Sequence, residues 1–93
     1  MSYVVRHTAA FKRDYKLALR RNLPIGKLQA VVAKLQKGEE LPPANHDHAL
    51  AGRWANHREC HIAPDWLLIY QIVNNILVLE LTRTGTHSDL FGK

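Results

Sequence analysis

The chain has 93 residues, of which 46% are hydrophobic and 23% are charged. A chain of this length is expected to form one domain, residues 1–93, with a single core that buries about 60 to 65% of the unfolded surface. This composition excludes a disordered chain. Thirteen Lys and Arg against eight Asp and Glu give a formal net charge of +5, which suits a polyanionic partner such as nucleic acid or an acidic protein.

Cysteine content and hydropathy indicate the cellular compartment in which the protein is expected. Cys60 is the only cysteine, which excludes an intrachain disulfide and a Cys-rich zinc finger and favours a reducing environment. The first residues lack the apolar run of a signal peptide, and no segment approaches the roughly 20 apolar residues of a membrane span. We therefore expect a cytoplasmic protein with no membrane partner.

The N-terminal half predicts a short strand followed by two helices. Residues 3–5 are β-prone, and Thr8 can cap a helix over residues 9–21 whose apolar positions are Phe11, Tyr15, Ala18 and Leu19. Pro24 suits the first turn of a second helix with the stripe Leu28, Val31, Val32 and Leu35. The first helix is basic, and its cations are candidates for contact with RNA: Lys12, Arg13, Lys16, Arg20 and Arg21.

The C-terminal half predicts a meander after a long loop, residues 39–52. Strands are expected over residues 54–62, 66–73 and 76–83, with Asn74 and Asn75 forming a two-residue hairpin turn. The predicted fold is therefore α+β: an N-terminal strand, a helical hairpin and a three-stranded antiparallel meander, with the helices packed on one face of the sheet. The hairpin turn would place Trp66 opposite Arg83 and Asp65 opposite Thr84.

Polar residues should meet at one edge of this meander, because the first strand ends, the second begins and the third ends there. RNA cleavage without a metal needs a base, an acid and fixed positive charge beside the phosphate. Histidine as a residue type can give or take a proton near neutral pH, which makes His61 and His87 candidates for the acid and the base. Asp65 can act as a base or orient a histidine, and Arg83 can bind phosphate oxygens. His48 can join them from the long loop. These five residues are the predicted catalytic set.

Two aromatic residues are candidates for binding the substrate. Trp66 and Phe91 offer surfaces on which an unpaired base could stack. Each residue taken alone also has a simpler structural explanation: a strand histidine is usually half-buried, Trp66 heads an apolar strand, and Gly85 marks a turn or bulge. Only their convergence on one edge favours a site.

The chain has six histidines, a residue type that commonly binds metals. His57 and His61 would lie about 13 Å apart on a strand, too far to share an ion. His46 and His48 could chelate only if their loop cooperated, and Cys60 is most simply a core residue. We predict no metal and no cofactor.

Three stretches carry a family resemblance: DHAL at 47–50, HIAPDWLLIY at 61–70 and RTGTHSDLFG at 83–92. Together, and in this order, they resemble the YafQ branch of the RelE/ParE toxin superfamily. The resemblance implies a RelE-like fold and a type II toxin that cuts mRNA in the A site of the 70S ribosome and is held inactive by a cognate antitoxin. It implies functional roles for His48, His61, Asp65, His87 and Phe91, with Arg83 contacting phosphate.

Two other functions stay open at this stage. A toxin similar to the ParE branch would inhibit DNA gyrase by contact and would need no catalytic cluster. A non-catalytic RNA-binding module would need only the basic helices, and fold alone excludes neither alternative. The histidines favour the endoribonuclease.

Overall fold

The structure is a computed structural model that describes residues 2–92. The helices and strands along the chain are β1 (Val4–His7), α1 (Ala9–Arg20), α2 (Ile25–Gln36), β2 (His48–Ala49), β3 (Arg58–Ala63), β4 (Trp66–Val73), β5 (Val78–Gly85) and α3 (His87–Phe91). Three short 3-10 turns lie between them, at Pro43–Asn45, Gly52–Trp54 and Asn74–Ile76. Among residues 2–92, none of the helices has the length and apolar character needed to cross a membrane.

The five strands form one mixed sheet in the order β1-β5-β4-β3-β2. β1 runs parallel to β5, and the other neighbouring strands are antiparallel. The α+β class, the N-terminal strand, the two helices and the antiparallel meander are therefore confirmed. The sheet has one strand more than predicted, because His48 and Ala49 in the long loop pair with Glu59 and Arg58 of β3.

The two long helices form as their apolar spacing predicts. The side-chain oxygen of Thr8 accepts a hydrogen bond from the Phe11 backbone N–H at 2.9 Å, which satisfies one free donor at the start of α1. Phe11 and Ala18 are buried, whereas Leu19, which the pattern placed on the apolar face, is 49% exposed. α2 buries Leu28, Val31 and Leu35 against the sheet.

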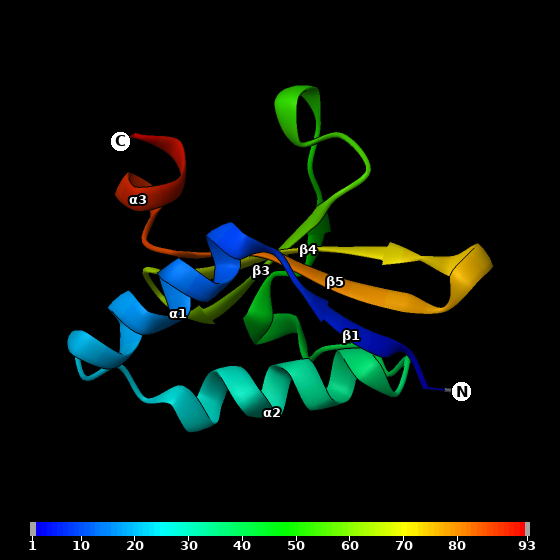
Figure 1. Ribbon diagram of the computed structural model, residues 1–93, viewed down its shortest axis with the longest axis horizontal. Helices are drawn as coiled ribbons and strands as arrows, with labels where there is room; N and C mark the ends of the chain where they lie inside the picture. The colour runs from blue at the N-terminus through cyan, green and yellow to red at the C-terminus, as the bar shows by residue number, and fades with distance from the viewer. Residues whose placement is uncertain (1, 93) are drawn as a thin grey trace.

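Side chains pack against both faces of the sheet. α1 and α2 cover one face, where the main core contains Phe11, Leu28, Trp66, Leu68, Tyr70, Leu79 and Leu81. A smaller cluster, built from Leu67, Ile69 and Leu90 with half-buried Leu50, Trp54 and Phe91, lies under α3. Figure 1 shows α3 on the opposite side of the sheet from α2. The prediction that the helices lie on one face is correct for the hairpin but missed α3.

The predicted register of the β4–β5 hairpin is wrong. Residues 74–77 form a four-residue loop with Leu77 in the left-handed conformation, so Val73 pairs with Val78. A bulge follows, because Tyr70 pairs with Leu81 while Ile69 pairs with Arg83, which leaves Thr82 between them. Arg83 is therefore opposite Ile69 instead of Trp66. Each extra residue in a turn or bulge shifts all later pairs.

Candidate active site

The shared edge of the meander is confirmed. Leu67 at the start of β4 pairs with His61 near the end of β3 and with Gly85 at the end of β5. Asp65 lies in the turn between β3 and β4, and His87 is the first residue of α3. Three segments that are distant in sequence therefore bring their polar residues together on the sheet face away from α1 and α2.

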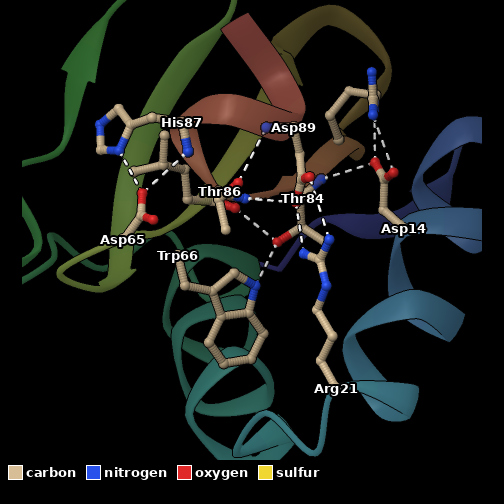
Figure 2. A network of polar contacts seen from close by, with 10 residues as sticks. Asp14, Arg21, Asp65, Trp66, Thr84, Thr86, His87 and Asp89 are labelled. Atoms are coloured by element: carbon tan, nitrogen blue, oxygen red, sulfur yellow. Dashed lines mark hydrogen bonds and ion pairs between the residues drawn. The ribbon is translucent and has the colours of Figure 1, made fainter. Parts of the chain in front are cut away.

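His87 and Asp65 form the shortest acid–histidine contact of this edge (Figure 2). The Nδ1 of His87 lies 2.7 Å from the Oδ1 of Asp65, and the His87 backbone N–H donates to the same oxygen at 3.1 Å. The hydrogen bonds from His87 lower the pKa of Asp65, so this carboxylate is ionised at neutral pH. With Nδ1–H held by Asp65, the Nε2 of His87 is left to exchange a proton with a substrate.

His61 lies beside His87, with ring centroids 5.8 Å apart in an edge-on arrangement. The ring of His46 packs against His61 from another direction at 5.2 Å. His46, which stands two residues before His48, was considered in the sequence only as a metal ligand and not as part of the catalytic set. Its left-handed backbone, at φ 47°, turns its ring toward β3.

His48 joins this cluster through the short strand β2. It pairs with Glu59, and the His48 Nε2 lies 3.6 Å from the Glu59 Oε1. The Nε2 of His61 lies 3.8 Å from the same oxygen. The Glu59 side chain is only 6% exposed. This carboxylate was not among the predicted site residues, and the available signal was its position two residues before His61, on the same face of a strand.

Hydrogen bonds hold the His48 segment against the sheet. The Asn45 side chain donates to the His61 carbonyl at 2.7 Å, and the Nδ1 of His48 lies 2.6 Å from the His46 carbonyl. Asp47 accepts from the Tyr70 hydroxyl at 2.7 Å and from Arg58 at 3.2 Å. Burial, reinforced by Asp47, raises the pKa of Tyr70, so its hydroxyl remains a donor. These bonds fix a loop that has little regular structure of its own.

The orientation of α3 is fixed by a capping box and an ion pair. The Thr86 side chain accepts from the Asp89 N–H and the Asp89 carboxylate accepts from the Thr86 N–H, both at 3.0 Å. Arg21 grips the same carboxylate at 2.7 and 3.3 Å (Figure 2), and this pairing, with the Thr86 bond, lowers the pKa of Asp89 to about 2. A Cβ on Gly85 would lie 2.9 Å from the Asp89 Cβ, so only glycine fits there.

Arg21 was predicted to contact RNA, but in the structure it forms an ion pair with Asp89. The other residues predicted to contact RNA, Lys12, Arg13, Lys16 and Arg20, are exposed. Within residues 2–92 these four side chains form no salt bridge. They leave a patch of free positive charge on α1.

Arg83 is directed toward α1 in this structure. Its Nε and Nη2 donate to the Asp14 carboxylate at 2.6 and 3.0 Å, and the Thr84 N–H donates to it at 3.1 Å. β1 ends at His7, opposite Leu81, so Asp14 covers the part of the β5 edge that has no strand beside it. The hydrogen bonds that Arg83 donates to Asp14 raise the pKa of Arg83. The Arg83 guanidinium is therefore bound to Asp14, whereas the sequence led us to expect that it is free to contact phosphate.

Trp66 is not a stacking surface, and this prediction is wrong. The side chain belongs to the main core and is 3% exposed, with its Nε1–H donating to the Thr84 hydroxyl at 3.0 Å (Figure 2). The hydroxyl in turn donates to the Leu67 carbonyl at 2.6 Å. The first residue of β4 points to the helices because the β3–β4 turn sets the pleat. Phe91, by contrast, is half-buried on α3, beside the smaller cluster.

In the part of the chain that the structure describes, residues 2–92, no three His, Cys, Asp or Glu side chains are grouped so as to hold a metal ion. Cys60 is fully buried, and burial raises the pKa of its thiol to about 12. A thiol in that state is a poor nucleophile.

Comparison with known proteins gives the family. Residues 3–92 match the model of a family described as the bacterial toxin of a type II toxin-antitoxin system, YafQ. This chain belongs to that family. Family membership confirms the predicted resemblance and the predicted enzyme class, an endoribonuclease toxin.

Relatives of the family extend over nearly the whole chain. The mRNA interferase toxin YafQ of Escherichia coli strain K12 is 37% identical over 89 residues, which is 95% of both chains. YafQ in the crystal structure of the E. coli DinJ-YafQ toxin-antitoxin complex superposes with a TM-score of 0.90 at 34% identity, over 99% of this chain and 100% of that one. A metal-bound toxin from Helicobacter pylori has a TM-score of 0.90 at 36% identity, over 98% and 100%.

Proposed function

We propose that this chain is a single-domain toxin that cleaves mRNA in the ribosomal A site by metal-independent general acid–base catalysis. The observation that carries the proposal is the His87–Asp65 pair, which lies beside His61 at the edge of the sheet, with His48 within reach of the same cluster. By analogy with the E. coli complex, we propose that a cognate antitoxin holds the toxin inactive. The activity would be exerted in the cytoplasm, where ribosomes translate.

The chemistry follows from the two kinds of histidine contact. A base removes the proton of the RNA 2′-hydroxyl, the 2′-oxygen forms a bond to phosphorus, and the bond from phosphorus to the 5′-oxygen breaks as an acid protonates that oxygen. His87 suits the acid, because Asp65 at 2.7 Å from its Nδ1 fixes the orientation of the ring and leaves Nε2 to protonate the 5′-oxygen. His61 suits the base, because its nearest carboxylate contact is longer, at 3.8 Å. His48, whose Nδ1 lies 2.6 Å from the His46 carbonyl, completes the cluster.

Substrate positioning is assigned to Phe91 and Arg83. Half-buried Phe91 retains part of its ring at the surface of α3, four residues from His87 on the same helix face, where a splayed base could stack. Arg83 would contact phosphate only by exchanging the Asp14 carboxylate for the substrate. Both groups are anionic oxygen acceptors, so the exchange conserves the hydrogen bonds of the guanidinium.

Mapping the 5′ ends of a defined message translated in a purified system tests this function. Cleavage within codons that is lost in His87→Ala and that persists in EDTA is the expected result. Intact message with stalled ribosomes would instead indicate an RNA-binding module. Intact message with inhibited DNA supercoiling would indicate a gyrase inhibitor, and loss of cleavage in EDTA would refute metal independence.

The basic patch on α1 is the proposed ribosome contact. Replacing Lys12, Arg13, Lys16 and Arg20 together with Gln should weaken ribosome binding and reduce its salt dependence, because fewer counterions are released on binding. Arg21 is left unchanged, since its loss would also disturb α3. The paired change Lys34→Gln and Lys37→Gln at the C-terminal end of α2 is the control. Equal binding by both variants would refute a role for the patch.

A further inference from the structure

A buried carboxylate without a Lys or Arg partner lies between two of the proposed catalytic histidines. Glu59 is in the middle of the sheet face away from α1 and α2, cross-paired with His48 on one side and Ile69 on the other. Its side chain is 6% exposed, and its only salt bridges among residues 2–92 are to His48 and His61. An apolar side chain would pack beside Ile69 without any desolvation cost, so stability alone does not explain an acid at this position.

We propose that Glu59 is a positioning residue that sets the proton arrangement of His48 and His61 for RNA cleavage. One oxygen, Oε1, faces the Nε2 atoms of both rings, at 3.6 and 3.8 Å. A carboxylate repels a nitrogen lone pair and attracts an N–H, so Glu59 favours a proton on each of these Nε2 atoms. The inference rests on the proposed function and names a group that the mechanism above does not use.

The two histidines then differ, because their second ring nitrogens differ. The Nδ1 of His48 lies 2.6 Å from the His46 carbonyl, so both ring nitrogens of His48 face oxygen acceptors. Neither nitrogen of His48 is therefore free to accept the proton of the 2′-hydroxyl.

His61 is left as the base in this arrangement. With the proton on Nε2, its Nδ1 carries the lone pair that can accept the proton of the 2′-hydroxyl. When it does so, the ring becomes a cation beside Glu59, and the carboxylate stabilises the product of the proton transfer. Glu59 thus acts on the reaction through His61 and does not itself touch the substrate.

Three variants test this assignment. Glu59→Gln keeps the shape of the side chain and removes its charge, Glu59→Asp keeps the charge on a shorter side chain, and Glu80→Gln is the matched control. Glu80 lies on β5, with a side chain that is 20% exposed and paired with Arg6, outside the histidine cluster. Each variant is measured for ribosome affinity, single-turnover cleavage of bound message, thermal unfolding and the nitrogen spectra of its imidazole rings.

For Glu59→Gln we expect a cleavage rate at least tenfold lower with ribosome affinity within twofold of the parent. In the nitrogen spectra, the Nε2–H tautomer of His61 should give way to a mixture of tautomers. Glu59→Asp should recover part of the rate, and Glu80→Gln should match the parent in every measurement. These effects separate positioning from folding, since a purely structural glutamate would change the unfolding midpoint and leave the tautomer unaltered.

The proposal is overturned if Glu59→Gln cleaves at the parental rate or if the His61 tautomer is the same in both proteins. It is also overturned if Glu59→Asp is as slow as Glu59→Gln while equally folded. The nitrogen spectra are recorded on the free protein, so they test the role of Glu59 even if the parent leaves ribosome-bound message intact. Intact ribosome-bound message with the parent protein would refute the proposed function, but it would not refute the role of Glu59 in positioning the two histidines.

Discussion

Adding one methyl group at Gly85 should disconnect α3 from the sheet. The new Cβ would lie 2.9 Å from the Asp89 Cβ and 3.0 Å from its Oδ2, whereas ordinary contacts begin at 3.4 Å. Asp89 must therefore move by about 0.5 Å or rotate away, and either movement weakens the capping box and the Arg21 ion pair. Because α3 has five residues, it is too short to be stable without these contacts.

The expected size of the effect follows from the free energy that the capping interaction of α3 contributes. Loss of a capping interaction costs about 1 kcal/mol and at most about 2 kcal/mol, which raises the detached population of α3 roughly 5- to 30-fold. Hydrogen exchange at the Leu90 and Gly92 amides, which bond to Thr86 and Ser88, should accelerate by that factor. His87 moves with α3, and because a misplacement of about 1 Å can cost a factor of 100, we expect cleavage to fall on the order of tenfold.

Gly26→Ala is the matched control for this experiment. A Cβ at Gly26, in the first turn of α2, has nothing within 4 Å. Alanine favours a helix over glycine by up to about 1 kcal/mol, so this variant should be as stable as the parent or more stable, with unchanged cleavage. The reasoning is refuted if Gly85→Ala retains both the parental cleavage rate and the slow exchange of the α3 amides.

Three other properties follow from the cited contacts. The folded-state pKa of Asp89 is lowered from 3.8 to about 2, so its contribution to stability is present above pH 3.8 and is lost as the pH falls through 2; a titration of the Leu90 amide shift should show this midpoint, and Arg21→Gln should move it upward. Burial raises the pKa of Cys60 to about 12, so a thiol reagent at pH 8 should modify it only after denaturation. Trp66→Ala should lower the free energy of unfolding by about 3 to 5 kcal/mol in urea titrations, and an unchanged stability would contradict its place in the core.

The long elements were predictable because local periodicity encodes them. The helices over Ala9–Arg20 and Ile25–Gln36 and the strand Trp66–Val73 appear in the sequence as apolar stripes or as a continuous β-prone run. The elements that were missed, β2 and α3, have two and five residues, too few for a period to be visible. Both exist because tertiary contacts stabilise them: β2 pairs with β3, and α3 packs Leu90 against Leu67 and Ile69.

The candidate site was also predictable only in part. Strand order alone brought His61, Asp65 and His87 to one edge, since a meander must reverse at each turn. Strand order does not predict the direction in which an individual side chain points. Trp66 turns into the core and Arg83 toward Asp14, because the loop of residues 74–77 and the bulge beside Thr82 set a register that the sequence pattern did not specify.

The sequence by itself determined the fold class, the positive charge of α1, the family and most members of the histidine cluster, because each depends on residue type and on spacing along the chain. Only the tertiary structure added Glu59 and His46 to that cluster and showed that Trp66, predicted to bind the substrate, lies in the core. It also assigned Arg21 to Asp89 in place of RNA. These contacts form across strands and between the end of α1 and α3. They join residues that are far apart in the sequence, and no periodic pattern along the chain predicts them.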